Sequence, residues 1–198
     1  MIKKRRYSLL KIISALVLLA LFTWATMFRD SEGPTHPSWT GTTMGSAYSI
    51  KLADSSLSKK QLESLKKHIE ACLEELNRQM STYRPDSEIS RFNSSTSTGP
   101  FAISPTFAGA CTFALALSRQ TDGIFDPTLD PLINLWGFGH KSKAEGTPNE
   151  EQIRQAQSII GFQHLSIRPG NAIQKDIPEL QLNLNSFVPG LAADEVAR

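Results

Sequence analysis

The chain has 198 residues, 40% hydrophobic and 20% charged, a composition typical of a folded globular protein and not of a disordered, collagen-like or multi-span membrane protein. Its net charge of +2 is unevenly distributed, because five of the 21 basic residues lie in the first eleven positions and no acidic residue precedes Asp30. Residues 29–198 carry 16 basic and 19 acidic residues, a net charge of −3, which disfavours a nucleic-acid-binding protein. Two cysteines, Cys72 and Cys111, are too few for a disulfide scaffold.

The amino terminus has the pattern of an export signal or a membrane anchor. Basic residues up to Lys11 precede an uncharged run of 17 residues, 12–28. This length lies between that of a signal-peptide core and the roughly 20 apolar residues of a spanning helix, so a cleaved signal and an uncleaved anchor both stay open. Because flanking basic residues stay in the cytoplasm, we expect residues 1–28 to attach the chain to the inner membrane, with the globular part facing the periplasm or cell exterior. Residues 29–38 are the predicted linker.

The globular part begins with a predicted strand and a long amphipathic helix. Residues 39–52 end in alternating apolar and polar side chains, the period of a strand. Ser58 is a predicted helix cap with Gln61 at the capping-box position, and apolar residues then recur at three- and four-residue steps to Met80. This spacing predicts one face in the core, including Cys72, and a solvated charged face.

A second helix is predicted from Ser104, with Pro105 in its first turn, to about Thr121. Apolar residues surround its axis, which predicts a buried helix. Cys111 is therefore interpreted as a small core residue in preference to a nucleophile.

A third helix is predicted from a cap at Thr147 to Gly161, and two strands are predicted at residues 164–168 and 180–185. The order of a strand, three helices and two strands predicts an α+β fold, a mixed or antiparallel sheet with packed helices.

Three blocks of unusual composition are the candidates for a site, since the sequence has no P-loop, complete dinucleotide fingerprint, paired-cysteine motif or two-histidine metal motif. In residues 41–45, glycines let the backbone approach a flat ligand while Met44 packs on it. In residues 80–93, Tyr83 can stack on an aromatic ring. In residues 121–139, two Asp-Pro steps predict an extended path beside aromatic side chains. Together the blocks suggest an aromatic, phosphate-bearing ligand.

In their order and spacing these blocks resemble the FAD:protein FMN transferase family, also called the ApbE family. The similar strings are Gly-Thr-Thr-Met-Gly at 41–45, Ser-Thr-Tyr-Arg-Pro-Asp-Ser-Glu at 81–88, Arg-Phe-Asn at 91–93, Thr-Asp-Gly at 121–123, Phe-Asp-Pro-Thr at 125–128 and Pro-Leu-Ile-Asn-Leu-Trp-Gly-Phe-Gly at 131–139. The resemblance covers residues 39–198, which are therefore expected to be the amino-terminal part of a flavin transferase domain.

The resemblance implies an enzyme that uses Mg²⁺ and FAD, transfers FMN to a threonine hydroxyl of a target protein and releases AMP. The implied partner is an acceptor such as a flavin-carrying subunit of a sodium-pumping or related redox complex. The implied magnesium ligand is Ser186, and the catalytic residues are expected beyond Arg198. The residues implied to contact FAD are Met44, Tyr83, Ile124, Phe125, Asp126 and Asn183.

Two positions depart from the family pattern. Asn183 stands where an aspartate is common, and Pro189 stands where a long polar residue is common. These departures favour an alternative, an FAD-binding electron-transfer carrier without transferase activity, and a third possibility is a membrane-anchored structural partner that lacks the site. Because the family continues past residue 198, we expect a truncated chain, incomplete at the carboxyl terminus and inactive alone.

Overall fold

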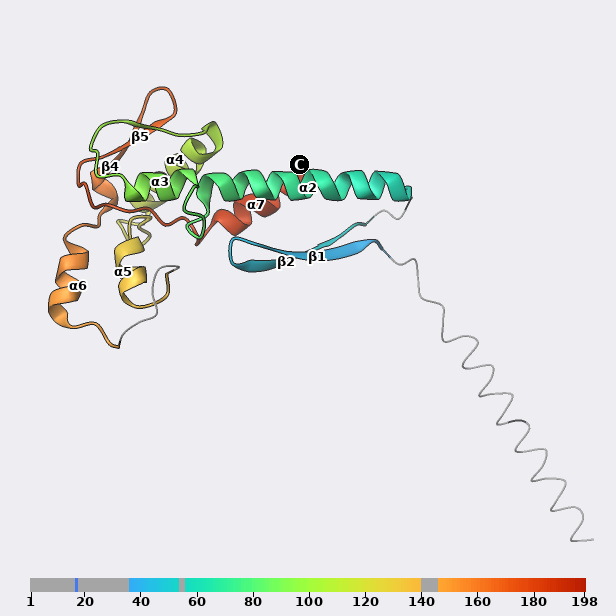
Figure 1. Ribbon diagram of the computed structural model, residues 1–198, viewed down its shortest axis with the longest axis horizontal. Helices are drawn as coiled ribbons and strands as arrows, with labels where there is room; N and C mark the ends of the chain where they lie inside the picture. The colour runs from blue at the N-terminus through green and yellow to red at the C-terminus, as the bar shows by residue number, and fades with distance from the viewer. Residues whose placement is uncertain (1–16, 18–35, 54–55, 140–145) are drawn as a thin grey trace, which may run out of the picture. The chain divides into compact units, whose positions relative to one another are not determined.

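The computed structural model describes residue 17 and residues 36–53, 56–139 and 146–198 (Figure 1). The chain divides into two compact units, one of Met1–Trp39 with Ser49–Leu57 and one of Thr40–Tyr48 with Ser58–Arg198. Apart from Val17, the predicted signal or anchor at residues 1–28 lies outside the described residues, as does most of the linker. In the described ranges, no helix has both the length and the apolar character needed to cross a membrane.

Strands β1 (Ser38–Thr43) and β2 (Ser46–Lys51) form a two-stranded sheet. Strand β2 confirms the strand predicted from the alternation at the end of residues 39–52. Strand β1 and the turn between the two strands were not predicted; Met44 and Gly45 form this turn, with φ of 49° and 74°. A two-residue turn with both φ values positive matches the twist of paired strands. This turn could not be predicted from the sequence, because methionine seldom adopts the left-handed conformation.

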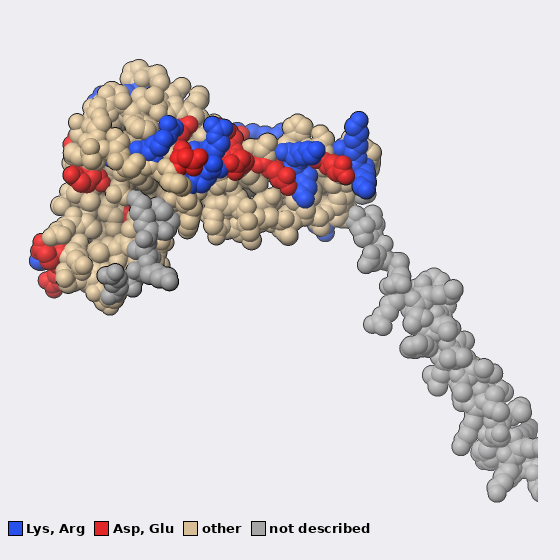
Figure 2. All heavy atoms as spheres, viewed as in Figure 1, with Lys and Arg blue, Asp and Glu red and all other residues tan. Residues whose placement is uncertain are grey.

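The predicted long helix is confirmed as α2 (Lys59–Met80), with Ser58 and Gln61 in a reciprocal capping box. One face is buried at residues that include Leu73 and Leu76, whereas Cys72 is half-buried. Figure 2 shows Lys and Arg alternating with Asp and Glu along α2. Ion pairs three and four residues apart, such as Lys66–Glu70 at 3.8 Å and Arg78–Glu75 at 3.0 Å, account for this solvated face.

Helix α3 (Glu88–Ser94) follows, in the block at residues 80–93, for which no helix was predicted. The predicted second helix is confirmed as α4 (Pro105–Gln120), with Ser104 as its cap. Cys111 is a core residue, as predicted, and burial raises the pKa of its thiol to about 12. The prediction of a fully buried helix is wrong, because Phe113 on the outer side of α4 is 55% exposed.

A small antiparallel sheet has the strand order β3 (Phe101–Ala102), β5 (Ala172–Lys175) and β4 (Leu165–Arg168), with Leu165 opposite Lys175. Strand β4 confirms the prediction at residues 164–168. The strand β5 was not predicted.

Three shorter helical elements lie between α4 and β4 in the chain: α5 (Asp130–Leu135), α6 (Glu150–Gln157) and a 3-10 turn at Phe162–His164. The third predicted helix exists as α6, but its capping box is made by Asn149 and Gln152 and not by Thr147. The helix also ends before Gly161, whose φ is 134°.

The strand predicted at residues 180–185 is absent from the described structure. Leu180, Leu182 and Leu184 are fully buried, so their alternation comes from an extended segment that crosses the core without a strand partner. The side chain of Asn93 takes the place of a neighbouring strand, since its Oδ1 accepts from the Leu182 N–H at 2.7 Å and its Nδ2 donates to the Leu182 carbonyl at 2.8 Å.

Helix α7 (Val188–Ala197) follows this segment and packs against α2 (Figure 1). Pro189 lies in its first turn, where an amide hydrogen has no partner within the helix. The described elements therefore form an α+β fold with antiparallel sheets, as predicted.

Lys175 on β5 is a fully buried cation. Its Nζ donates to the carbonyls of Leu180 at 2.9 Å and Phe92 at 3.3 Å and lies 4.9 Å from the centre of the Phe92 ring. Burial lowers the pKa of this amine below its usual value. Lys175 thus joins the sheet, α3 and the extended segment at the cost of partial desolvation.

Candidate functional site

A pocket of about 460 Å³ lies where three segments distant in the sequence meet. These segments are the chain after α2, residues 124–138, and residues 183–186. The pocket is lined by Tyr83, Ile124, Phe125, Asp126, Leu129, Ile133, Phe138, Asn183, Asn185 and Ser186. The structure therefore brings together six of the seven predicted FAD and metal residues, and Met44 is the one that does not line the pocket.

Met44 lies at the tip of the β1–β2 hairpin, next to the Tyr83 side of the pocket. A Cβ atom placed on the neighbouring Gly45 would lie 3.2 Å from the Tyr83 ring, so the turn passes close to this ring. The tip is also tied to α2, because the Nδ2 of Asn77 donates to the Oγ1 of Thr43 at 2.7 Å. These contacts hold Met44 close to the Tyr83 ring that lines the pocket.

Tyr83 is 52% exposed, while hydrogen bonds fix the backbone around it. The Tyr83 amide donates to the Oγ of Ser81 at 3.3 Å, and the Oγ of Ser87 donates to the Ser81 carbonyl at 2.8 Å. Arg84 pairs with Asp86 in the turn and with Glu74 on α2, and the Arg84 hydrogen bond holds the pKa of Asp86 below its usual value. A half-exposed ring on such a turn is a ready surface for a flat ligand.

The carboxylate of Asp126 is used inside the protein. Its Oδ1 accepts from the amide and the hydroxyl of Thr128 at 2.8 and 2.6 Å, and its Oδ2 accepts from the Phe162 amide at 3.0 Å. The hydroxyl oxygen of Thr128 also accepts from the Gly161 amide at 2.7 Å. Asp126 therefore fixes the pocket loop to the turn after α6, and its implied contact with FAD stays a prediction.

Asn183 is held between α5 and its own loop. Its Nδ2 donates to the Oδ1 of Asp130 at 2.8 Å, and its Oδ1 accepts from the Asn185 amide at 3.0 Å. The second oxygen of Asp130 accepts from the Nδ2 of Asn134 at 2.7 Å. The prediction of an extended path at Asp130 is wrong, because Pro131 needs no amide hydrogen in a first helical turn and α5 begins there.

A model of the ApbE family matches residues 44–198. The chain belongs to the ApbE family. It is 42% identical over 163 residues to the FAD:protein FMN transferase of Vibrio cholerae serotype O1, a match that covers 79% of this chain and 46% of that protein. It is 34% identical over 191 residues to the FAD:protein FMN transferase of Escherichia coli strain K12, covering 93% and 54%.

The fold is also that of solved ApbE structures. The flavin transferase ApbE from Vibrio cholerae has a TM-score of 0.76 at 40% identity, a match that covers 82% of this chain and 52% of that one. The chain thus spans about half the length of the curated relatives it matches.

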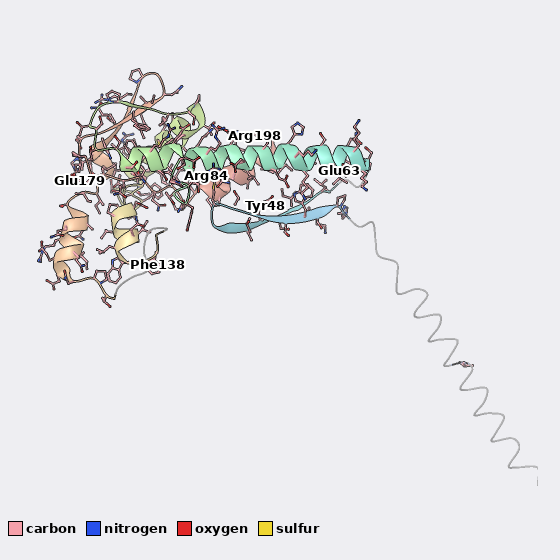
Figure 3. All side chains as sticks on the ribbon, viewed as in Figure 1. Tyr48, Glu63, Arg84, Phe138, Glu179 and Arg198 are labelled. Carbon is pink, nitrogen blue, oxygen red and sulfur yellow. The ribbon has the colours of Figure 1, made fainter. Side chains whose placement is uncertain are left out.

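Two apolar residues that complete the pocket of this ApbE chain, Leu129 and Ile133, were missed by sequence reasoning, whereas Phe138 is one of the aromatic side chains predicted in residues 121–139. The four-residue spacing of Leu129 and Ile133, one helical turn, was the available signal. Phe138, labelled in Figure 3 just past α5, is 80% exposed. The chain passes close to α5 here, since a Cβ atom on Gly139 would overlap the Asn134 side chain.

Oxygen atoms at the pocket suit the ligand preference of Mg²⁺. Ser186, Asn183 and Asn185 offer hydroxyl, amide and backbone oxygens, and Ser186 is the residue implied to bind the metal. Within the described part of the chain, no group of three or more His, Cys, Asp or Glu side chains gathers as a metal site. The donors present therefore fit magnesium in atom type, and the implied role of Ser186 stays a prediction.

Proposed function

We propose that this chain belongs to an enzyme that transfers FMN from FAD to a threonine hydroxyl of a target protein in a magnesium-dependent reaction that releases AMP. In this proposal the pocket beside Tyr83 binds the flavin part of FAD. The observation that carries it is the assembly of six predicted site residues, from segments up to 103 positions apart, around one pocket. The names of the relatives in Vibrio cholerae and Escherichia coli support the same activity.

The pocket lining contains groups suited to both edges of a flavin ring. The segment at residues 124–138 contributes the apolar side chains of Ile124, Leu129, Ile133 and Phe138, which suit the dimethylbenzene edge. The segment at residues 183–186 contributes amide and hydroxyl groups, which suit the carbonyls and N–H of the pyrimidine edge. The pocket volume of about 460 Å³ is within the usual range for small-molecule sites.

Phosphoryl transfer from FAD depends mainly on positioning and on neutralising the pyrophosphate charge. Magnesium, when bound, supplies that neutralisation, and Ser186 would hold it through an oxygen atom. The rest of the chain's contribution is orientation: Tyr83 holds the ring face, and Asp126 keeps the loop at residues 124–128 in place through Thr128 and Phe162.

The proposed acceptor is a flavin-carrying subunit of a sodium-pumping or related redox complex. The proposed location is the inner membrane, with the globular part facing the periplasm or cell exterior. The basic residues before the uncharged run at residues 12–28 support this orientation.

The transfer is tested with the cellular polypeptide that contains these residues, incubated with FAD, MgCl₂ and the acceptor subunit. We expect flavin fluorescence on the acceptor in a denaturing gel, equimolar AMP, and no labelling of an acceptor whose target threonine is replaced by valine. FAD binding without AMP release or labelling would contradict the transferase proposal and indicate the carrier. Absence of FAD binding would contradict both and leave the structural partner.

A further inference from the structure

Asp130 is a fully buried carboxylate at the start of α5, directly behind the pocket. Its two oxygens accept hydrogen bonds from the amide groups of Asn183 at 2.8 Å and Asn134 at 2.7 Å. No ion pair to Asp130 occurs in the parts of the chain that the structure describes. A buried carboxylate is costly without hydrogen bonds, so these two amide donors are what make Asp130 tolerable at this position.

The Asp130 carboxylate determines the orientation of the Asn183 side chain. An ionised carboxylate only accepts hydrogen bonds, so Asn183 must turn its NH₂ group toward Asp130. Its carbonyl oxygen is then placed to accept from the Asn185 amide at 3.0 Å. In the opposite orientation, the Asn183 carbonyl oxygen would face an Asp130 oxygen and the Asn183 NH₂ group would face the Asn185 amide N–H. Both hydrogen bonds would be lost.

Asn183 lines the pocket while Asp130 does not. The remaining N–H of the Asn183 amide and the second lone pair of its oxygen are the groups left for a ligand. The pyrimidine edge of a flavin alternates carbonyl acceptors with an N–H donor, so its fit depends on which end of the amide it meets.

We propose that Asp130 is a positioning residue of the flavin site, which acts by fixing the amide of Asn183 in one orientation. This inference rests on the proposed function, because it takes the pocket ligand to be the flavin of FAD. It requires a carboxylate at position 130 and an amide at position 183.

Three variants distinguish this positioning role from a general structural role, because they change the hydrogen bonds that the side chains at positions 130 and 183 can form. Asn183→Asp opposes two carboxylates. Asp130→Asn leaves one oxygen for two amide donors. The exchange Asp130→Asn with Asn183→Asp restores every bond, because the new amide at position 130 would donate to the new carboxylate at position 183 and accept from Asn134. That new carboxylate would still accept from the Asn185 amide.

Binding of FAD to the full 198-residue chain is measured by flavin fluorescence, with ADP as a ligand that shares the adenosine diphosphate part and lacks the flavin. We expect each single variant to bind FAD about tenfold more weakly, the loss of about one hydrogen bond to a charged group. We expect ADP affinity to stay unchanged. The exchange variant should regain the thermal stability of the wild type but not its FAD affinity, because a carboxylate at position 183 has no N–H to donate to the flavin. Glu63→Gln, an exposed carboxylate-to-amide change on α2 outside the pocket lining, is the charge-matched control and should bind like the wild type.

An exchange variant no more stable than the single variants, or Asp130→Asn binding FAD like the wild type, would overturn the role of Asp130 and leave the proposed function intact. Equal losses of FAD and ADP affinity would also overturn it, by indicating a general loss of structure. If a single variant does not fold, the exchange variant still decides, because restored folding supports the pairing of positions 130 and 183 and continued loss of folding contradicts it. A wild-type chain that binds no FAD would instead contradict the proposed function itself.

Discussion

Replacing Asp126 by asparagine should destabilise the pocket loop, although the two side chains have nearly the same volume. The carboxylate has three internal hydrogen bonds, two on Oδ1 and one on Oδ2. An asparagine has one acceptor oxygen, so either the Phe162 amide or both donors of Thr128 would face an NH₂ group. At least one hydrogen bond to a charged acceptor is lost and a donor is left opposed to another donor.

Hydrogen bonds to charged groups contribute about 1.5–3 kcal/mol each, so we expect Asp126→Asn to lower the free energy of unfolding by about 2 kcal/mol. For a chain of this size that corresponds to a melting temperature about 4–8 °C lower. Thermal and urea unfolding followed by circular dichroism measure both quantities. Glu63→Gln, which removes the same charge from an exposed position on α2, should leave them unchanged. Equal unfolding midpoints for Asp126→Asn and the wild type would refute the assignment of this carboxylate to the loop.

Three further outcomes are expected. With a thiol-specific reagent at pH 8, half-buried Cys72 should react in the folded chain, while buried Cys111, with a thiol pKa of about 12, should react only on unfolding. Reaction of Cys111 in the folded chain would contradict its core position. Burial lowers the pKa of Lys175 in the folded chain below 10.5, so the unfolded chain binds more protons as this amine titrates. The free energy of unfolding of the wild type, relative to that of Lys175→Met, should therefore rise as pH increases toward 10.5. A constant difference between the two chains in urea titrations from about pH 7 to 10 would argue against it. Asn77→Ala removes the donor to Thr43 and should speed amide hydrogen exchange at residues 43–46 with little effect at α4, whereas unchanged exchange would show that the hairpin tip is held by other contacts.

Local signals predicted the long elements correctly. The capping box at Ser58 and the cap at Ser104 depend on residues within one helical turn, so α2 and α4 were readable from the sequence. The short helices α3 and α5 were missed because seven and six residues carry too little apolar periodicity to outweigh polar or proline-containing sequences.

Long-range contacts explain the remaining errors. The alternation at residues 180–185 predicted a strand, yet the partner of Leu182 is the side chain of Asn93, 89 positions away, and no strand pairs with it in the described structure. No local pattern reports such a partner. The hairpin turn at Met44 was likewise hidden, since its geometry is unusual for methionine and its contact with Tyr83 spans distant segments.

The candidate site was predictable as a set of residues and not as a set of interactions. The resemblance to the ApbE family identified six residues that line the pocket. It did not indicate that the Asp126 carboxylate bonds to Phe162, 36 positions away, or that Asp130 lies behind Asn183. Both facts depend on how α5 and the loop after α6 pack.

Titration of FAD into the full 198-residue chain, with flavin fluorescence as the readout, tests the central claim most directly. If the pocket binds the flavin against Tyr83, FAD fluorescence is quenched with saturation, Tyr83→Phe behaves like the wild type, and Tyr83→Ala binds at least about fivefold more weakly because a stacking contact of about 1 kcal/mol or more is removed. Absence of saturable FAD binding by the wild-type chain, or full affinity in Tyr83→Ala, would contradict the claim.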